Sequence, residues 1–91
     1  MQHLKSKNTE FQKAVGKIIT RLREEKAQDS INNFARSYGF DRGNLSKIER
    51  GIIGCRLETA WKISEACDVK FSQFVKLLEE ELGDNFKLID E

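Results

Sequence analysis

Apolar residues recur at helical spacing in five segments of the chain, and glycines or short polar stretches separate these segments. The first segment predicts a helix from about residue 10 to residue 26, opened by a capping box of Thr9 and Gln12. No segment shows the two-residue alternation of a strand, so the pattern predicts an all-α fold. The apolar face of this first helix comprises Phe11, Ala14, Val15, Ile18, Ile19 and Leu22.

The second and third helices are short and lie close together in the sequence. Ser30 is a good N-cap for the second helix, and Gly39 ends it because this position often needs a left-handed backbone, which costs glycine little. Asp41 caps the third helix and Gly51 ends it, so the segment predicts a helix, a tight turn and a helix. The positions expected to face the core are Ile31, Phe34 and Ala35 in the second helix and Leu45 and Ile48 in the third.

A loop at residues 51–56 leads to the last two helices. We expect Trp61 in the core, because a tryptophan in the middle of an apolar helix is buried more often than it stacks on unpaired bases. Cys67 lies on the same stripe and is expected to be a buried, inert thiol. The apolar positions are Leu57, Ala60, Trp61, Ile63, Ala66 and Cys67 in the fourth helix and Phe71, Phe74, Val75, Leu77, Leu78 and Leu82 in the fifth.

The 91 residues have the length of one domain. We expect a flexible arm at residues 1–9, a helical domain at residues 10–82 and an acidic tail at residues 83–91. A domain of this size buries only about 60 to 65% of the surface of its unfolded chain, so association with a second copy would add useful burial.

The net charge of +1 conceals an uneven distribution. Residues 79–91 contain six acidic residues and one lysine, whereas residues 1–78 contain fifteen basic and nine acidic residues. The body of the protein therefore suits a polyanionic partner and the tail does not.

Several classes of function lack the residues they need. Cys55, Cys67 and His3 are too few for a zinc site, and no cofactor is expected. No phosphate-binding glycine loop or nucleophile motif indicates an enzyme. The chain contains no run of about 18 apolar residues and does not open with a signal peptide, which favours the cytoplasm over a membrane.

Residues 39–51 read GFDRGNLSKIERG and follow the segment INNFARSY. Together they closely resemble the helix-turn-helix of the Cro and lambda-repressor type, also called the XRE family. The resemblance extends over about residues 11–78 and is most specific at LSKIERG, residues 45–51. It implies a five-helix lambda-repressor-like domain in which the second and third helices form the helix-turn-helix and bind double-stranded DNA.

The third helix presents polar residues on the side opposite Leu45 and Ile48. A major groove about 12 Å wide admits one helix, whose residues near the amino end reach the base edges. Arginine can bond O6 and N7 of guanine, lysine can reach guanine or a phosphate, and glycine leaves room for a thymine methyl group or for close approach of the backbone. The resemblance places base reading at Arg42, Gly43 and Lys47, with Asn44 and Ser46 close by.

Phosphate contacts fix the register of such a helix on the duplex, and helix amino ends suit this task. Members of the family usually carry a glutamine near the start of the second helix, where it braces the recognition helix and touches a phosphate. The matching position here holds Ile31 or Asn32. The candidate phosphate-binding residues are Ser30, Asn32, Asn33, Arg50 and Arg56, together with the amides of residues 51–54.

Glu49 is an acid beside the surface expected to meet DNA, and it therefore needs a partner. The resemblance pairs the matching glutamate with an arginine of the first helix, here Arg23, which would otherwise be a phosphate contact. Breaking a buried pair of this kind costs on the order of 3 to 5 kcal/mol, so we expect a structural role for Glu49.

The fifth helix carries apolar residues over more of its circumference than one core contact requires. We expect a second copy to cover the extra face, since a two-fold dimer sets two recognition helices one DNA turn apart, about 34 Å, and reads a palindrome. In the alternative, Phe86, Leu88 and Ile89 of the tail fold back over this face. The expected interface residues are Phe71, Phe74, Val75, Leu78 and Leu82.

These features predict a homodimeric, sequence-specific regulator of transcription that binds double-stranded DNA, and more specifically a repressor of a palindromic operator. No metal, cofactor or small-molecule ligand is expected. One alternative is a controller of a restriction-modification operon, which activates at one site and represses at another. The other, from a different class, is a helical protein-interaction module without DNA binding.

Overall fold

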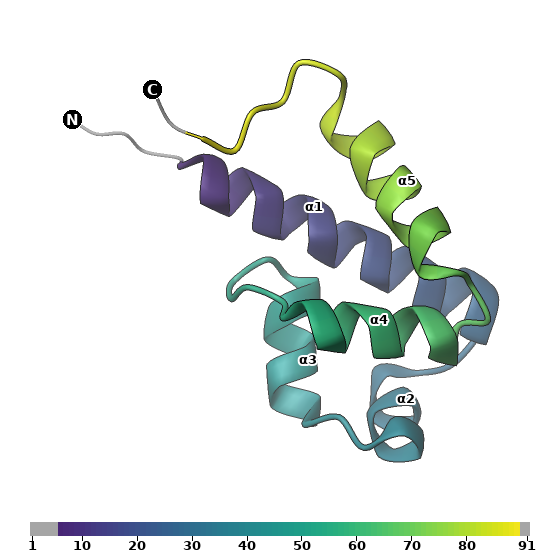
Figure 1. Ribbon diagram of the computed structural model, residues 1–91. Coiled ribbons are helices and arrows are strands. Elements are labelled where there is room, and N and C mark those ends of the chain that lie inside the picture. The colour runs from purple at the N-terminus through teal and green to yellow at the C-terminus, as the bar shows by residue number, and fades with distance from the viewer. Residues whose placement is uncertain (1–5, 90–91) are drawn as a thin grey trace.

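Five α-helices follow one another in the order that the apolar pattern predicts (Figure 1). The computed structural model describes residues 6–89, and this range contains no strand, which confirms the all-α fold. None of the helices in this range is both long enough and apolar enough to cross a membrane. The helices are α1 (Lys7–Leu22), α2 (Ile31–Tyr38), α3 (Arg42–Glu49), α4 (Leu57–Ala66) and α5 (Phe71–Leu82), and a π-helical turn (Arg23–Ala27) continues α1.

The first helix starts earlier than predicted. Its N-cap is Ser6, whose hydroxyl oxygen accepts a hydrogen bond from the backbone nitrogen of Thr9 at 3.0 Å. The predicted capping box of Thr9 and Gln12 is therefore wrong, because Ser6 satisfies a free amide one turn earlier. Residues 7–9 belong to α1 and not to an arm, and His3 lies outside the described residues.

Helices α2 and α3 form the predicted helix, turn and helix. The hydroxyl of Ser30 accepts a hydrogen bond from the backbone nitrogen of Asn33 at 3.1 Å, and the carboxylate of Asp41 accepts one from Asn44 at 2.8 Å. Gly39 follows α2 with a φ of 74°, a left-handed conformation that a residue with a side chain adopts less easily. The predicted start of both helices and the predicted end of α2 are thus confirmed.

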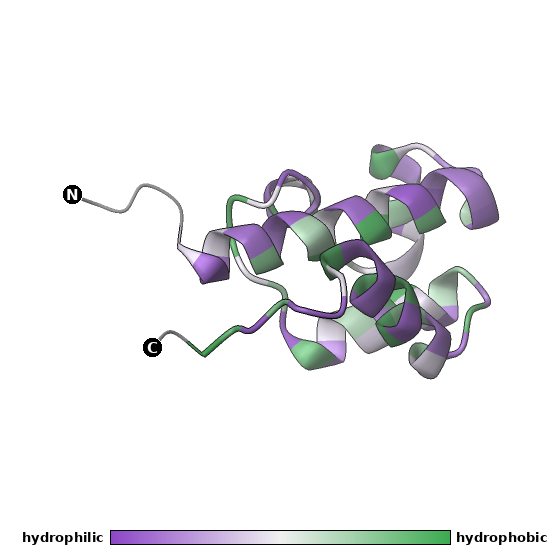
Figure 2. Ribbon diagram, turned by 90° about the horizontal axis from the view of Figure 1, so that it is seen from above, coloured by the Kyte–Doolittle hydropathy of each residue, from purple (hydrophilic) through white to green (hydrophobic). Residues whose placement is uncertain are grey.

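The core lies between α1, α2, α3 and α4, and α5 packs against α1 and α4 (Figure 1). Figure 2 shows hydrophobic and hydrophilic residues alternating around the helices, as expected for helices that bury one side only. The largest fully buried hydrophobic side chains are Ile18, Ile19, Phe34, Leu45 and Ile63.

Helices α1 and α3 approach each other closely at Gly16. A Cβ atom at this position would overlap the carbonyl oxygens of Ile48 and Glu49 at the end of α3. Because Gly16 has no side chain, α1 lies directly against the carboxyl end of α3 and fixes its position.

Trp61 is at the surface, so its predicted place in the core is wrong. It is 50% exposed, and Leu57, one turn earlier in α4, is 68% exposed. The buried stripe of α4 consists of Ala60, Ile63 and Cys67, which recur at intervals of three and four residues. Trp61 follows Ala60 by one residue, about 100° around the helix, and therefore lies on a separate face with Leu57.

Phe74 lies in the core, and its prediction as an interface residue is also wrong. It is 2% exposed beneath α5 and is not available to a second copy. Leu78 is half-buried against the same core. More of the apolar surface of α5 is therefore buried within a single chain than the apolar pattern suggested.

The residues after α5 turn back toward the start of the chain. The rings of Phe86 and Phe11 stack with centroids 6.2 Å apart, and Nζ of Lys7 donates to the carbonyl oxygen of Ile89 at 3.2 Å. The tail therefore packs on α1, and Phe86 and Leu88 also line a hollow with Leu82 at the end of α5. The alternative, in which the tail covers the apolar face of α5, is met only at this end of the helix, and Leu88 stays 43% exposed. In Figure 1 the tail runs along one side of α1, and α2 and α3 lie on the other.

Candidate DNA-binding surface

Helix α3 turns its apolar side to the core and its polar side to solvent. Leu45 and Ile48 are 2% and 8% exposed, and they hold the helix against the rest of the molecule. The residues predicted to read bases therefore share one side of one short helix. The exposed positions are Arg42, Gly43, Asn44, Lys47 and Arg50, and Ser46 is half-buried.

The amino end of α3 is held from two directions. The carboxylate of Asp41 accepts the backbone hydrogen bond of Asn44, and it occupies the place that a phosphate would otherwise take at this helix end. Arg42, the first residue of α3, donates from Nε to Oδ1 of Asn32 in α2 at 2.6 Å. Of the two candidates for the bracing position, Asn32 thus makes the contact with α3, and Ile31 packs against the core.

The carboxyl end of α3 is held by Arg23. Its Nε and Nη2 atoms donate to the two carboxylate oxygens of Glu49, and Nη1 donates to the carbonyl oxygen of Asp29 at 2.8 Å. The hydrogen bond to Glu49 raises the pKa of Arg23 above its ordinary value, although burial acts in the opposite direction. One side chain therefore fixes both the loop before α2 and the end of α3.

The predicted phosphate-binding residues lie around the ends of the helix-turn-helix. The hydroxyl of Ser30 accepts from the backbone of Asn33, and its hydrogen stays available to another acceptor. The side chains of Asn32 and Arg50 are exposed. Arg56 is the N-cap of α4 and makes no capping hydrogen bond, so the first amides of that helix have no side-chain acceptor from their cap.

A hollow between α3 and α4 contains two residues that the sequence analysis did not single out. Its volume is about 400 Å³, and its lining includes Asn44, Arg56, Thr59 and Lys62. Arg56, the N-cap, and Thr59 and Lys62 of α4 are spaced three residues apart and therefore lie on one side of that helix. This spacing is visible in the sequence. The hollow places two cations and a hydroxyl beside the polar side of α3.

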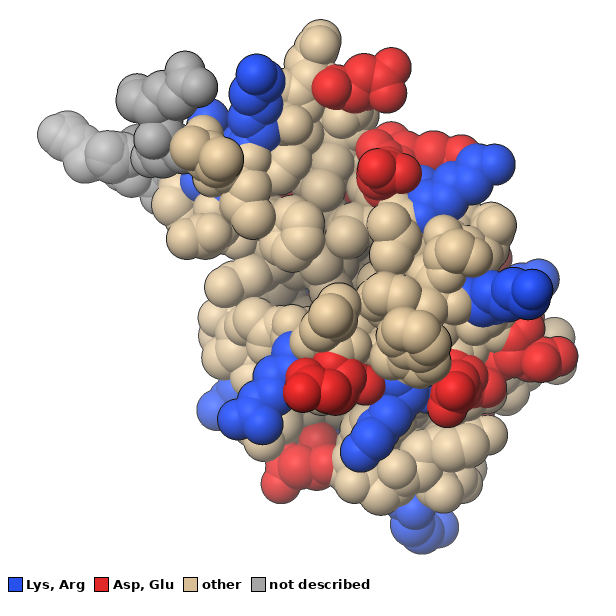
Figure 3. Space-filling view, viewed as in Figure 1, with Lys and Arg blue, Asp and Glu red and all other residues tan. Residues whose placement is uncertain are grey.

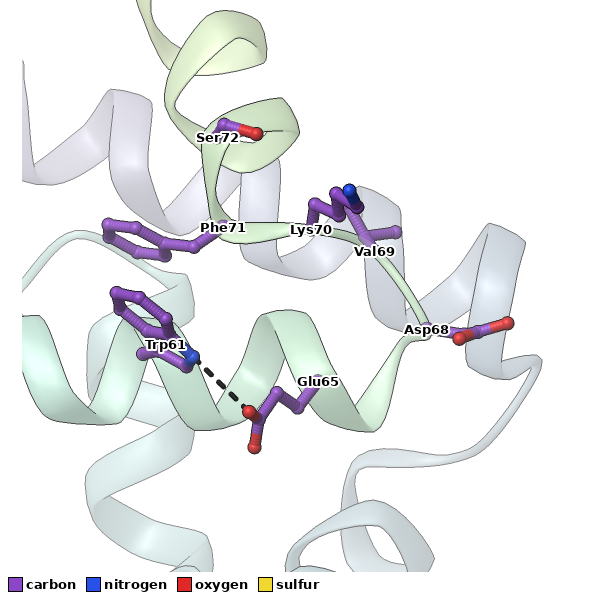
Figure 4. A pocket seen from close by; sticks show the side chains of 7 residues that line it. All are labelled: Trp61, Glu65, Asp68, Val69, Lys70, Phe71 and Ser72. Carbon is purple, nitrogen blue, oxygen red and sulfur yellow. Dashed lines mark hydrogen bonds between the residues drawn. The ribbon is translucent and has the colours of Figure 1, made fainter.

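The exposed Leu57 and Trp61 and the half-buried Phe71 form a second surface, here called the aromatic face. The ring of Trp61 stacks on that of Phe71 with centroids 4.8 Å apart, and its Nε1 donates to Glu65 at 3.2 Å (Figure 4). Phe71 in turn stacks on Phe74, with centroids 5.8 Å apart, which joins the face to the core. Figure 3 shows an uncharged area on this side of the molecule, with acidic and basic side chains along its edge. Contiguous exposed apolar surface is typical of association sites.

Cys55 and Cys67 are free thiols. Burial raises the pKa of Cys55 to about 11 and also raises that of Cys67, because the thiolate form is poorly solvated there. Cys67 is 3% exposed, which confirms the predicted buried thiol. Among residues 6–89, no group of three or more histidine, cysteine or acidic side chains is arranged to hold a metal ion.

The sequence matches the family model described as Helix-turn-helix over residues 19–74, which is more than half of the chain. The matched segment begins within α1, contains α2, α3 and α4, and ends within α5. None of the curated proteins matches the chain. The chain therefore belongs to the helix-turn-helix family of the Cro and lambda-repressor type, and its function is DNA binding in the regulation of transcription.

Proposed function

We propose that this protein is a homodimeric repressor that acts in the cytoplasm by occupying a palindromic operator, without catalysis and without a cofactor. The polar side of α3 carries this proposal, since Arg42, Lys47 and Arg50 are exposed opposite the buried Leu45 and Ile48. One helix of this kind fits the major groove and offers cations to base edges and phosphates. A module that bound only proteins would not need three cations on this side.

The bases would be read from the amino-terminal half of α3. Arg42 is assigned to a guanine, and Lys47 to a guanine or a phosphate, because both cations match the acceptors of that base. Gly43 presents only its backbone and leaves room for a thymine methyl group. Asn44 and Ser46 complete the base-reading residues.

The phosphates would be bound on both sides of α3. Helix α2 offers the donors of its first turn to one strand, and the hollow between α3 and α4 offers its two cations to the other. Each phosphate neutralised by a cation steepens the salt dependence of binding by roughly 0.9 in logarithmic units. The residues assigned to phosphates are Ser30, Asn32, Asn33, Arg50, Arg56, Thr59 and Lys62.

Two copies would associate through the aromatic face. Glu65, Asp68 and Lys70 line the hollow beside Trp61, so both signs of charge border this surface. In a two-fold arrangement the lysine of one copy can face an acid of the other, which favours a second copy over a partner of one charge. The interface proposed here differs from the one expected from the sequence. Phe71 belongs to both.

Val75, Leu78 and Leu82 take a smaller part in this proposal. All three are half-buried within one chain, and Leu82 borders the hollow beneath the tail. Val75 follows Phe71 by one turn of α5 and would extend the aromatic face.

Fluorescence anisotropy with a labelled random duplex at two salt concentrations tests the proposal. We expect binding in the range of about 10⁻⁴ to 10⁻⁶ M that weakens steeply as salt rises. Binding that is absent or independent of salt would contradict the proposal and favour the protein-interaction module.

A further inference from the structure

The first two turns of α1 lie between the tail and the loop that follows α3 (Figure 1). Every residue from Lys7 to Lys13 is exposed or half-buried, and the buried residues of α1 begin at Ala14. These turns therefore gain little stability from the core. Helix ends of this kind fray readily unless contacts outside the helix hold them.

Residues 84–89 of the tail, here called the strap, hold one side of these turns. The ring of Phe86 stacks on that of Phe11, and the carbonyl oxygen of Ile89 accepts a hydrogen bond from Nζ of Lys7. The backbone amide of Phe86 donates to Gly83 at 3.3 Å, within the tail itself. The strap is therefore attached to α1 through side chains and can separate from it without disrupting a helix.

The loop at residues 51–56 packs on the opposite side of the same turns. Lys13 follows Phe11 by two residues, about 200° around the helix, and Gly51 lies directly against it. A Cβ atom on Gly51 would come within 2.8 Å of Cα of Lys13, so no side chain fits between the two backbones. The amides of Gly51 and Ile52 donate to carbonyl oxygens of α3 at 3.0 and 2.9 Å. The start of the loop is thus joined both to α1 and to the end of α3.

We propose that the strap, the first two turns of α1 and this loop open and close as one cooperative unit, so that the strap controls the stability of the loop. When Phe86 leaves Phe11, the two turns lose their support on one side and fray. Gly51 then loses the helix backbone against which it packs, and the loop is released. The coupling is reciprocal, because a loosened loop equally weakens the attachment of the strap.

The unit matters for DNA binding, and this part of the inference rests on the proposed function. Ile53, Gly54 and Arg56 of the loop line the hollow that is assigned to phosphates. Release of the strap therefore loosens one wall of that hollow, although the strap itself lies on the other side of α1. Any interaction that takes the strap away from α1 weakens binding to DNA, which makes the strap a control element within the fold.

Native-state hydrogen exchange of the full chain, followed for single amides by NMR, tests the unit without DNA. Phe86→Ala removes the aromatic stack, so the amides of Phe11, Gly51 and Ile52 should all lose protection, by at least about threefold. Lys87→Ala is the matched control, because Lys87 is the exposed neighbour of Phe86 in the strap. It should leave the protection of these amides unchanged.

A second variant separates local opening from unfolding of the whole protein. Ile63 is fully buried in the core, and Ile63→Val should lower the protection of every amide that exchanges only by global unfolding. The amides of Gly51 and Ile52 should keep their protection in this variant, because the core stays folded while the unit is open. If Phe86→Ala does not fold, Phe86→Leu, which loses the stack but stays apolar, takes its place.

Two outcomes overturn the proposal. If Gly51 and Ile52 keep their protection in the variant of Phe86, the loop opens independently of the strap. If their protection falls equally in that variant and in Ile63→Val, they exchange through unfolding of the whole protein and belong to no smaller unit.

The same measurement with a random duplex tests the connection to DNA. At about ten times the dissociation constant, the duplex should raise the protection of the Phe11 amide about tenfold, since DNA favours the closed unit. Unchanged protection with DNA bound would overturn the control of DNA binding by the strap. If no duplex binds, the proposed function fails, whereas the exchange measured without DNA still decides whether the unit exists.

Discussion

Arg23 and Glu49 lie 26 residues apart in the chain and form a two-point ion pair with N–O distances of 2.8 and 3.0 Å. The pair joins the end of α1 to the end of α3, and its side chains are only 10% and 7% exposed. The presentation of cations on the outer side of α3 therefore depends on an interaction behind that helix.

Glu49→Ala should destabilise the protein by about 3 to 5 kcal/mol, because Arg23 would lose the buried carboxylate that two of its nitrogen atoms bind, and would keep only the carbonyl oxygen of Asp29 and the exposed, more distant Glu24. Urea unfolding followed by circular dichroism measures this loss. Glu80→Ala is the control, since Glu80 is exposed on α5 and its removal should change the free energy of unfolding by less than about 0.5 kcal/mol. Equal losses in the two variants would contradict a structural role for the pair.

Gly16→Ala should also destabilise the protein, by about 1 to 3 kcal/mol. The new methyl group would overlap the carbonyl oxygens of Ile48 and Glu49 and push α1 away from α3, which outweighs the better helix propensity of alanine. Gly54→Ala provides the comparison, because its Cβ would lie 3.5 Å from Nε2 of Gln12, an ordinary contact. If unfolding in urea shows Gly16→Ala to be as stable as Gly54→Ala, the close approach of the two helices is not as described.

The roles of residues whose effect is confined to one helical turn could be predicted from the sequence. Ser30, Gly39 and Asp41 have consequences within one helical turn, through a side-chain oxygen or a free backbone conformation, so their positions determine where α2 and α3 begin and where α2 ends. The same reasoning failed at Thr9, since Ser6 offers an equally good cap one turn earlier and the longer helix gains more backbone hydrogen bonds.

The residues whose role depends on distant parts of the chain could not be predicted in this way. Trp61 and Ala60 are adjacent apolar residues, and only the direction from which α1 and α5 pack decides which of them is buried. The bond between Asn32 and Arg42 likewise depends on the angle between two helices. Lys62 is an intermediate case, because its spacing from Arg56 was visible although the hollow that they share was not.

Lys47→Ala should weaken operator binding and leave folding intact, because the side chain is exposed on the polar side of α3. If Lys47 contacts a phosphate, the logarithmic salt slope should fall by roughly 0.9, and if it reads a guanine the preference at one position should fall instead. Fluorescence anisotropy at several salt concentrations distinguishes these outcomes.

Lys76→Ala is the control for charge alone. Lys76 is exposed on α5, which Figure 1 shows on the other side of α1 from α3, so its loss should leave the salt slope unchanged. Equal effects of the two lysine variants would remove Lys47 from the DNA-binding residues.

Trp61→Asp should shift the protein toward the monomer, raising the dimer dissociation constant at least about tenfold, because the largest apolar side chain of the proposed interface would be replaced by a carboxylate that loses its water on association. Sedimentation equilibrium measures this shift. Ile52→Asp serves as control, since Ile52 is 55% exposed but lies outside the aromatic face. A dimer unaffected by Trp61→Asp would show that two copies meet elsewhere.

Cys55 should react slowly with iodoacetamide in the folded protein. Its pKa of about 11 lies two units above the ordinary value of 9.0, so the reactive thiolate is about 100-fold scarcer at pH 8. The rate should rise about tenfold per pH unit up to pH 10, whereas an ordinary thiol levels off near pH 9. Peptide mass spectrometry identifies the modified cysteine, and a folded-state rate that levels off near pH 9 would contradict the burial of this thiol.

The stacking of Phe86 on Phe11 brings the two ends of the described chain within reach of each other. A short peptide joining them would close the backbone into a ring without crossing the outer side of α3, since the tail and α3 lie on different sides of α1. Ring closure reduces the entropy of the unfolded chain. A cyclic form should therefore melt at a higher temperature and leave the outer side of α3 accessible.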